Sequence, residues 1–331
     1  MTTTGAPERR EPAAPARPAD AAAHRPLLAL AAVMIALAVG SIVGLVGDDR
    51  TLLGQPIWAK PLKFSLSIAI YAVTLAWLIG LTRGRLRRAS WWAGTISAIA
   101  LVVEMVVIVG AVATGTRSHF NVSTPLAATA WSVMAISIVV VWVATLVVAF
   151  ALLRAPLGDA ARSLAIRAGS ILALGGMALA FLMTSPTAAQ MADFRGIAGA
   201  HAVGVADGGP GLPVLGWSTV AGDLRIPHFV GMHALQVLIL FVMALEWAAR
   251  RVAVLADVRV RFGFVVIATV LAAATTAIVT SQALMGESIV SPSGPIAVAT
   301  TATWSVAVLA GATVLARGAA RMRAVSRGVV A

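Results

Sequence analysis

Eight long apolar blocks separated by polar loops constrain the fold of this chain more than any other feature. The blocks are residues 27–47, 64–82, 92–114, 126–153, 168–184, 228–249, 262–285 and 295–316. Most have about the 20 residues that an α-helix needs to cross the hydrocarbon core of a bilayer. Because 60% of the residues are apolar and only 11% are charged, a soluble chain could not cover its apolar surface. We predict an all-α, polytopic membrane protein with eight transmembrane helices in the lipid bilayer.

Basic residues are distributed unevenly between the two sets of loops. Nineteen of the 25 basic residues lie in the two tails and in the second, fourth and sixth loops. The loops of the opposite face carry six basic and six acidic residues. The positive-inside rule therefore predicts a multi-pass protein of the plasma (inner) membrane with both termini in the cytoplasm. The same asymmetry explains the net charge of +12, so we expect no nucleic-acid partner.

The chain divides into two similar membrane units between two polar tails. Residues 1–26 are rich in Ala, Pro and Arg and predict a disordered cytoplasmic tail. Residues 27–153 form one four-helix unit, and residues 154–316 form a second one that contains a long outer loop at 185–227. Residues 317–331 are predicted to be a basic cytoplasmic tail. The absence of cysteine excludes disulfides, thiolate metal sites and covalent c-type haem attachment.

Faint internal similarity favours a duplication of the four-helix unit. The segment Lys-Pro-Leu-Lys-Phe at 60–64 is matched 165 residues later by Arg-Ile-Pro-His-Phe at 225–229. The segments 117–125 and 287–295 are likewise separated by 170 residues, and each precedes an apolar block that contains a tryptophan. Four helices return the chain to its starting side, so the repeats would be parallel and related by an axis along the membrane normal.

Candidate site residues gather on the outer face and at the start of the sixth block. The two lysines of the chain lie here, and lysine side chains at a helix start either extend to the membrane interface or bind anions. For a small-molecule or lipid ligand on this face, the candidate binding residues are Lys60, Lys63, Arg117, Asn121, Trp217 and Gln236. The candidate catalytic residues are His228, His233, Asp223, Arg225 and Glu104.

His228 and His233 are the most informative pair. A spacing of five residues places them roughly 140° apart on a helix, so they cannot easily share one metal from one helix face. His233 lies deep enough in its block to be a functional candidate by default. Together with His119, these histidines are the candidate ligands of a haem or a divalent metal. A structural hydrogen bond between helices is the competing interpretation of His233.

Glu104 is the single acidic residue near a predicted membrane midplane. A charged side chain there costs roughly 2.5–3.5 kcal/mol on insertion scales. Its role is that of a proton relay, a cation site or a hydrogen bond between helices, and Gln282 is a weaker candidate of the same kind. Glu246 is expected to form an ordinary i,i+4 ion pair with Arg250. His201, in a glycine-rich stretch, is given no role.

Three classes of function fit these residues. The first is a histidine-centred site on the extracytoplasmic face with haem- or metal-dependent redox chemistry, or with hydrolase chemistry that adds Asp223. The second is a transporter or lipid-handling protein that uses Glu104 and the outer Lys, Arg and His cluster. The third is a structural or assembly protein without catalysis.

Two resemblances bear on these classes. The eight helices in a 4+4 arrangement, with histidines at their outer ends, resemble the architecture of haem A synthase, which implies haem. That family carries histidines within even-numbered helices of both halves, whereas the second and eighth blocks here have none. Segments 58–64, 118–121 and 211–236 also resemble an uncharacterised family of bacterial multi-pass membrane proteins. That resemblance implies a bacterial inner-membrane protein and no particular activity.

Overall fold

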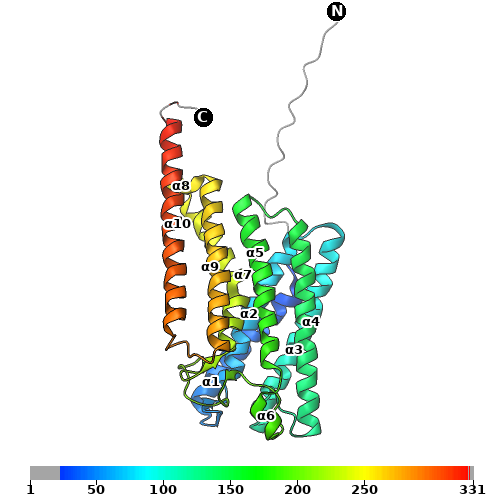
Figure 1. The fold of residues 1–331 in the computed structure, drawn as a ribbon. Helices are drawn as coiled ribbons and strands as arrows, with labels where there is room; N and C mark the ends of the chain where they lie inside the picture. The colour runs from blue at the N-terminus through cyan, green and yellow to red at the C-terminus, as the bar shows by residue number, and fades with distance from the viewer. Residues whose placement is uncertain (1–22, 327, 329–331) are drawn as a thin grey trace, which may run out of the picture.

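Eight long helices make up most of the described part of the chain. Figure 1 shows how they are arranged. The computed structural model describes residues 23–326 and residue 328, so most of the predicted tail at 1–26 lies outside the described residues. The all-α, eight-helix fold predicted from hydropathy is confirmed. The long helices are α1 (Arg25–Gly47), α2 (Ala59–Leu81), α3 (Gly84–Thr114), α4 (Pro125–Arg154), α5 (Ala160–Ala178), α7 (Arg225–Ala248), α9 (Val258–Leu284) and α10 (Gly294–Ser326).

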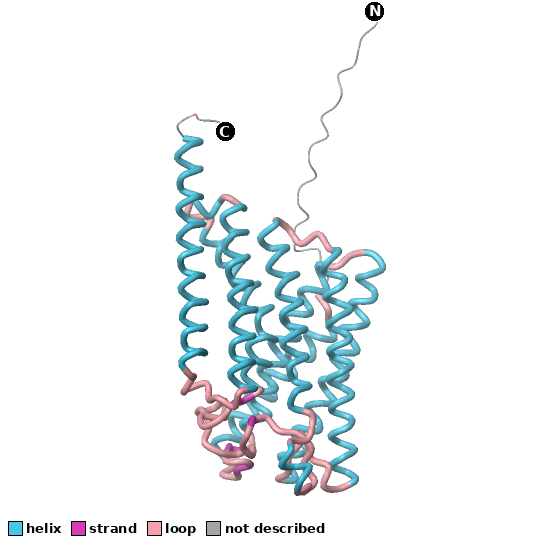
Figure 2. Tube along the Cα trace, viewed as in Figure 1, coloured by secondary structure: helices cyan, strands magenta, loops and turns pink. Residues whose placement is uncertain are grey.

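The short elements lie mostly at one end of the bundle, which we call the loop face. It carries the connections 48–58, 115–124, 184–224 and 285–293 (Figure 2). The elements there are the antiparallel pairs β1 (Thr51–Leu52) with β2 (Gln55–Pro56) and β3 (Ala202–Val203) with β4 (Gly222–Asp223), and the helix α6 (Ala188–Ala192). The 3₁₀ helix η2 (Leu179–Met183) continues α5, and α8 (Ala253–Ala256) lies at the opposite end.

Several helices extend beyond the apolar blocks that identify them. α3 begins at Gly84 rather than near residue 92, and α10 continues to Ser326 through the segment expected to be a tail. The extra turns carry arginines, which hydropathy assigns to loops although arginine is a good helix former. Local signals set other boundaries. Thr124 and Asp159 cap α4 and α5 through their side chains, and Gly115 ends α3 in a left-handed conformation.

The helices pack mainly in sequential groups. α1 packs against α2 and α3 against α4, whereas α5 packs against α7, and α9 packs against both α7 and α10. Residues of α5 and α7 also join the apolar core of the first four helices. α10 stands at the edge of the bundle, and none of its most apolar stretch is buried, so this helix faces lipid (Figure 1). These helix contacts do not test the duplication of the four-helix unit, which stays a prediction.

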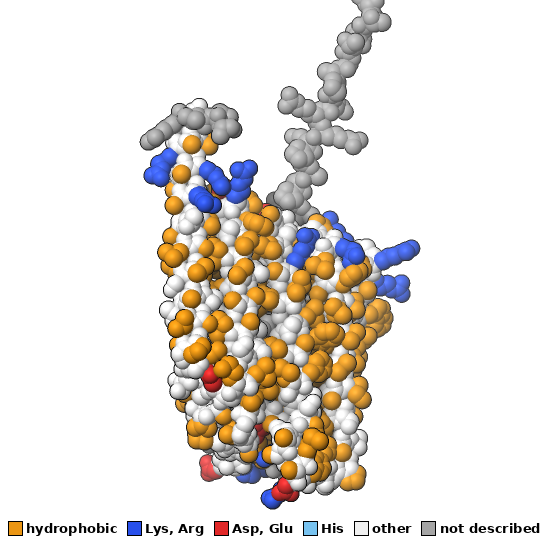
Figure 3. Space-filling view, viewed as in Figure 1, with side chains coloured by type: hydrophobic (Ala, Val, Ile, Leu, Met, Phe, Trp, Pro, Cys, Tyr) orange, Lys and Arg blue, Asp and Glu red, His pale blue; other side chains and the backbone are white. Residues whose placement is uncertain are grey.

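Arginines gather at the end opposite the loop face. Figure 3 shows Lys and Arg side chains around this end, and the start of α1 and the end of α10 lie on the same side (Figure 1). The prediction that Glu246 pairs with Arg250 is wrong. Glu246 instead accepts hydrogen bonds from Arg162 of α5, with 2.9 Å between Arg162 Nε and Glu246 Oε1. Arg261 similarly bonds Asp159, with 2.8 Å between the two side chains. Glu246 therefore pairs with another helix rather than with Arg250, the residue four positions later in its own chain segment.

α5 and α7 cross in close backbone contact. A Cβ atom on Gly176 would collide with the backbone of Gly231 and Met232, and one on Gly231 would meet Gly176 Cα at 2.6 Å. Small residues that let two backbones approach are typical of membrane helix interfaces. The neighbouring Gly175 faces open space.

We expect Gly176→Ala to destabilise the protein, because the added methyl group forces α5 and α7 apart. Overpacking of this kind costs about 1–3 kcal/mol. Thermal unfolding of the detergent-solubilised protein should show a lower Tm for this variant, whereas the matched control Gly175→Ala should be neutral or slightly stabilising. Equal Tm changes in the two variants would show that the helix crossing is not tight.

Candidate functional site

Glu104 lies on the buried face of α3. It shares that face with Leu101, Met105 and Ile108, which follow helical spacing and belong to the apolar core. Its side chain is 1% exposed, and its Oε2 atom is buried without a hydrogen-bond partner in the part of the chain that the structure describes. An unpartnered buried carboxyl oxygen is costly, which marks this residue as more than a packing element.

His119 bridges Glu104 and Lys60. Its Nδ1 atom is 3.0 Å from Lys60 Nζ and 3.2 Å from Ser118 Oγ, and its Nε2 atom is 3.7 Å from Glu104 Oε1. Lys60 comes from the first turn of α2, and His119 comes from the connection between α3 and α4. The three side chains therefore form a continuous line from the loop face to the buried carboxyl group.

Burial decides the protonation state of the imidazole. It holds the pKa of His119 well below the ordinary value of 6.5, and the charges of Lys60 and His201 lower it further. A neutral imidazole beside an ammonium group must accept at Nδ1, so its proton sits on Nε2 and points toward Glu104. The distance of 3.7 Å between Nε2 and Glu104 Oε1 is longer than a hydrogen bond, so the two groups are neighbours without a direct hydrogen bond.

The position of His119 depends on contacts between two loops. The next residue, Phe120, is buried and has a φ of 63°, a conformation that is strained for a bulky side chain. Its carbonyl group accepts a hydrogen bond from Ala198 at 2.8 Å, and Asn121 forms an antiparallel bridge with Ile197. Gly199, with a φ of 131°, leaves room for the Phe120 ring, which a Cβ would approach to 2.6 Å. The long loop thus holds the 118–121 segment against the helix bundle.

His201 and Asp207 form a second pair in the same region. His201 Nδ1 is 2.7 Å from Asp207 Oδ2, and the backbone N–H groups of His201 and Ala202 also donate to this carboxylate. Burial raises the pKa of Asp207, but these hydrogen bonds outweigh it and lower the pKa to about 2. Burial lowers the pKa of His201, against the raising effect of Asp207. This pair was not predicted from the sequence. The only feature there that points to it is an aspartate six residues after a histidine.

Lys63, Asp223 and Arg225 fasten the long loop over α2 and α7. Asp223 accepts from the Nε atom of Arg225 at 2.9 Å and from the backbone N–H of Ser218 at 2.8 Å. Lys63 Nζ donates to the carbonyl oxygen of Leu215 at 2.9 Å. Lys60 lies within electrostatic range of Lys63, Arg225, Glu104 and Asp207, so the charged groups form one cluster. Because its hydrogen bonds stay within the loop and the start of α7, the geometry gives Asp223 a structural role.

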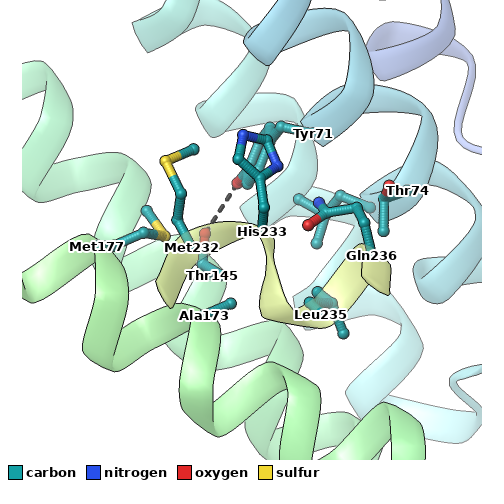
Figure 4. Close-up of a pocket in the computed structure, with 10 residues that line it drawn as sticks. Tyr71, Thr74, Thr145, Ala173, Met177, Met232, His233, Leu235 and Gln236 are labelled. Carbon is teal, nitrogen blue, oxygen red and sulfur yellow. Dashed lines mark hydrogen bonds between the residues drawn. The ribbon is translucent and has the colours of Figure 1, made fainter. Parts of the chain in front are cut away.

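The histidines of α7 lie apart from this line. His228 donates through Nδ1 to the carbonyl oxygen of Gly176 at 2.8 Å, so it points toward α5. His233 and Gln236 line a cavity of about 30 Å³ between α2, α4, α5 and α7 (Figure 4). The three candidate metal-ligating histidines are therefore split between two places.

The remaining candidate residues either make contacts within the loops or make no side-chain hydrogen bond or ion pair with the line of Lys60, His119 and Glu104. Asn121 Oδ1 accepts from the N–H and hydroxyl groups of Ser123, which is a turn-forming arrangement. Trp217 packs edge-on against Phe229 of α7. Gln282 lies near the end of α9 and donates to the carbonyl of Ser288, so it organises a loop. The guanidinium group of Arg117 makes no hydrogen bond or ion pair with the part of the chain that the structure describes.

A haem does not fit beside these histidines as they are arranged. Both ring nitrogens of His119 face other groups, Lys60 and Glu104, and the cavity beside His233 has room for roughly one water molecule rather than a porphyrin. Within residues 23–326, no group of three or more His, Cys, Asp or Glu residues has a geometry that could hold a metal ion. The geometry supports proton transfer better than it supports the metal or haem hypothesis.

Comparison of the chain with protein-family models, with curated proteins and with solved structures finds no match. The function must therefore be inferred from the site itself.

We expect the stability of the protein to fall with acidification below about pH 6.5. The pKa values of His119 and His201 are lowered by folding, so the unfolded chain binds more protons in this range and the free energy of unfolding rises with pH. Each unit by which a pKa is lowered contributes about 1.4 kcal/mol. Tm measured from about pH 7.5 to about pH 5 should show a weaker dependence in His119→Gln and in His201→Gln.

Asp49→Asn is the matched control for this measurement, because Asp49 is exposed on the loop face. It should keep the pH dependence of the wild-type protein. A dependence that is unchanged in both histidine variants would contradict the assignment of buried, neutral imidazoles.

Proposed function

We propose that this chain is a proton-coupled transporter in which Lys60, His119 and Glu104 pass protons between the loop face and the membrane interior. One observation carries the proposal: His119 links an ammonium group at 3.0 Å to a buried carboxyl group at 3.7 Å. An intramembrane carboxyl group beside a histidine is typical of proton relays in pumps and transporters.

The distribution of arginines supports the orientation of this relay. They surround the end at which α1 begins and α10 ends, and the positive-inside rule assigns that end to the cytoplasm. The loop face is then extracytoplasmic, and the membrane is the plasma membrane of a bacterium. Protons enter the relay from outside the cell.

Each residue has a distinct part in the relay. The neutral imidazole of His119 takes a proton at Nδ1, from Lys60 or from water, and releases the proton that Nε2 already carries to Glu104. The imidazole ring then turns, or exchanges its Nδ1 proton with water, so that an N–H group again points toward Glu104. Lys60 regains a proton from water at the loop face, so proton number is conserved. Glu104 Oε2, which has no hydrogen-bond partner, is the position from which the proton leaves toward the interior.

The lysines give the entrance a preference for anions. Lys63 bonds only a carbonyl oxygen among the described residues, and Lys60 bonds only an imidazole, so neither ammonium group is directly paired with a carboxylate. A small anion or a lipid phosphate group would complete these interactions. We infer that the co-substrate is anionic.

Proton flux into proteoliposomes tests the relay. With an internal pH-sensitive dye, an acid pulse outside and potassium–valinomycin to balance charge, the wild-type protein should acidify the lumen. Glu104→Gln removes the acceptor and should slow this flux on the order of 10- to 100-fold, and His119→Gln should slow it similarly. Asp49→Asn should behave as wild type. A wild-type flux equal to that of empty liposomes, or full flux in Glu104→Gln, would contradict the proposal.

A second candidate function is metal-dependent chemistry centred on His228. Its Nδ1–H group donates to the Gly176 carbonyl at 2.8 Å, which fixes the ring and leaves the Nε2 lone pair free. Metal-ligating histidines usually have this second interaction.

An absorption spectrum and metal analysis of the purified protein test this candidate. A bound haem, zinc or iron that is lost in His228→Gln would favour metal chemistry. Colourless protein with none of these metals would count against it. The outcome is independent of the proton-flux measurement, since His228 is not part of the relay.

A further inference from the structure

A small cavity between α2, α4, α5 and α7 is lined by sulfur-containing and polar side chains. It has a volume of about 30 Å³, enough for one water molecule or one ion. The lining side chains that carry an oxygen, nitrogen or sulfur atom are those of Tyr71, Thr74, Thr145, Met177, Met232, His233 and Gln236 (Figure 4). Neither the relay nor the loop-face cluster uses this cavity.

The helix crossing described above places two methionines at its wall. Met177 follows Gly176, and Met232 follows Gly231, so the close approach of these glycines fixes the relative positions of both methionines. Figure 4 shows the two thioether side chains on the same side of His233, with Gln236 and Thr74 on the other side. Two thioether groups and one imidazole therefore meet at one cavity.

The chemistry of these donors selects one class of ion. No side chain with a full charge lines the cavity, so a divalent ion would be left without neutralising ligands in a low-dielectric region. Thioether sulfur is a soft ligand that favours Cu(I), and imidazole also suits copper. The hydroxyl group of Tyr71 is already bonded to Thr145 at 2.8 Å, and that of Thr74 donates to the carbonyl oxygen of Ile70 at 2.7 Å. The two sulfur atoms, the imidazole and the amide of Gln236 remain as the available ligands.

We propose that Met177, Met232 and His233 form a binding site for a soft monovalent cation, Cu(I). The inference does not depend on the proton relay, because it uses none of the relay residues. Gln236 lies one turn after His233, and its Oε1 atom is buried without a hydrogen-bond partner among the described residues.

Competition with bicinchoninate tests the site. The full-length protein, purified in detergent without a polyhistidine tag, is titrated with Cu(I) under anaerobic, ascorbate-reduced conditions. The wild-type protein should remove about one equivalent of Cu(I) from the chelator. Met177→Leu and Met232→Leu keep the side-chain volume and should each weaken binding by at least about 10-fold, the scale on which even outer-shell partners of metal sites act.

Met243→Leu is the matched control, because Met243 lies on the same helix and is 49% exposed on the lipid side. It should bind Cu(I) as the wild-type protein does. Elution volume and Tm establish that each variant is folded, and Met→Leu changes are usually tolerated. Absence of Cu(I) binding in the wild-type protein, or equal affinity in all three leucine variants, would overturn the proposal.

Discussion

The burial of the Glu104 carboxyl group is the constraint on which the loop face of this protein depends. A carboxyl group among Leu101, Met105 and Ile108 has lost its water and must be compensated by protein groups. His119 and Lys60 are the groups that approach it, and both reach it from the loop face. The site is thus a line of polar groups that descends from the loops to an acidic residue inside the bundle.

The loops hold this line in place. Phe120 adopts a strained backbone conformation, which costs of the order of 1–3 kcal/mol and persists only where the surroundings impose it. The surroundings here are the bridge between Asn121 and Ile197 and the space left by Gly199. The ion pair of Asp223 with Arg225 fastens the same long loop to the start of α7. A loop that appears too long for a simple connection is therefore the scaffold that positions His119.

The sequence predicted the parts of the structure that depend on local composition. Apolar blocks of the right length identified all eight helices, and Glu104 stood out because a single acidic residue interrupts such a block. Side-chain pairs that depend on the tertiary structure were not predictable in this way. The pairing of Glu246 with Arg162 rather than Arg250, and of His201 with Asp207, follows from helix packing and loop folding. Met177 and Met232 gave no signal, because methionine in an apolar helix is ordinary and only the Gly176–Gly231 crossing brings them to one cavity.

Infrared difference spectroscopy of the protein in lipid tests the central claim most directly. A protonated carboxyl group has a carbonyl stretching band that its ionised form lacks, so a change of pH reports proton exchange at a buried acid. We predict a titrating carboxyl band that disappears in Glu104→Gln and titrates differently in His119→Gln. A band that persists in Glu104→Gln, or that titrates identically when His119 is replaced, would contradict the relay.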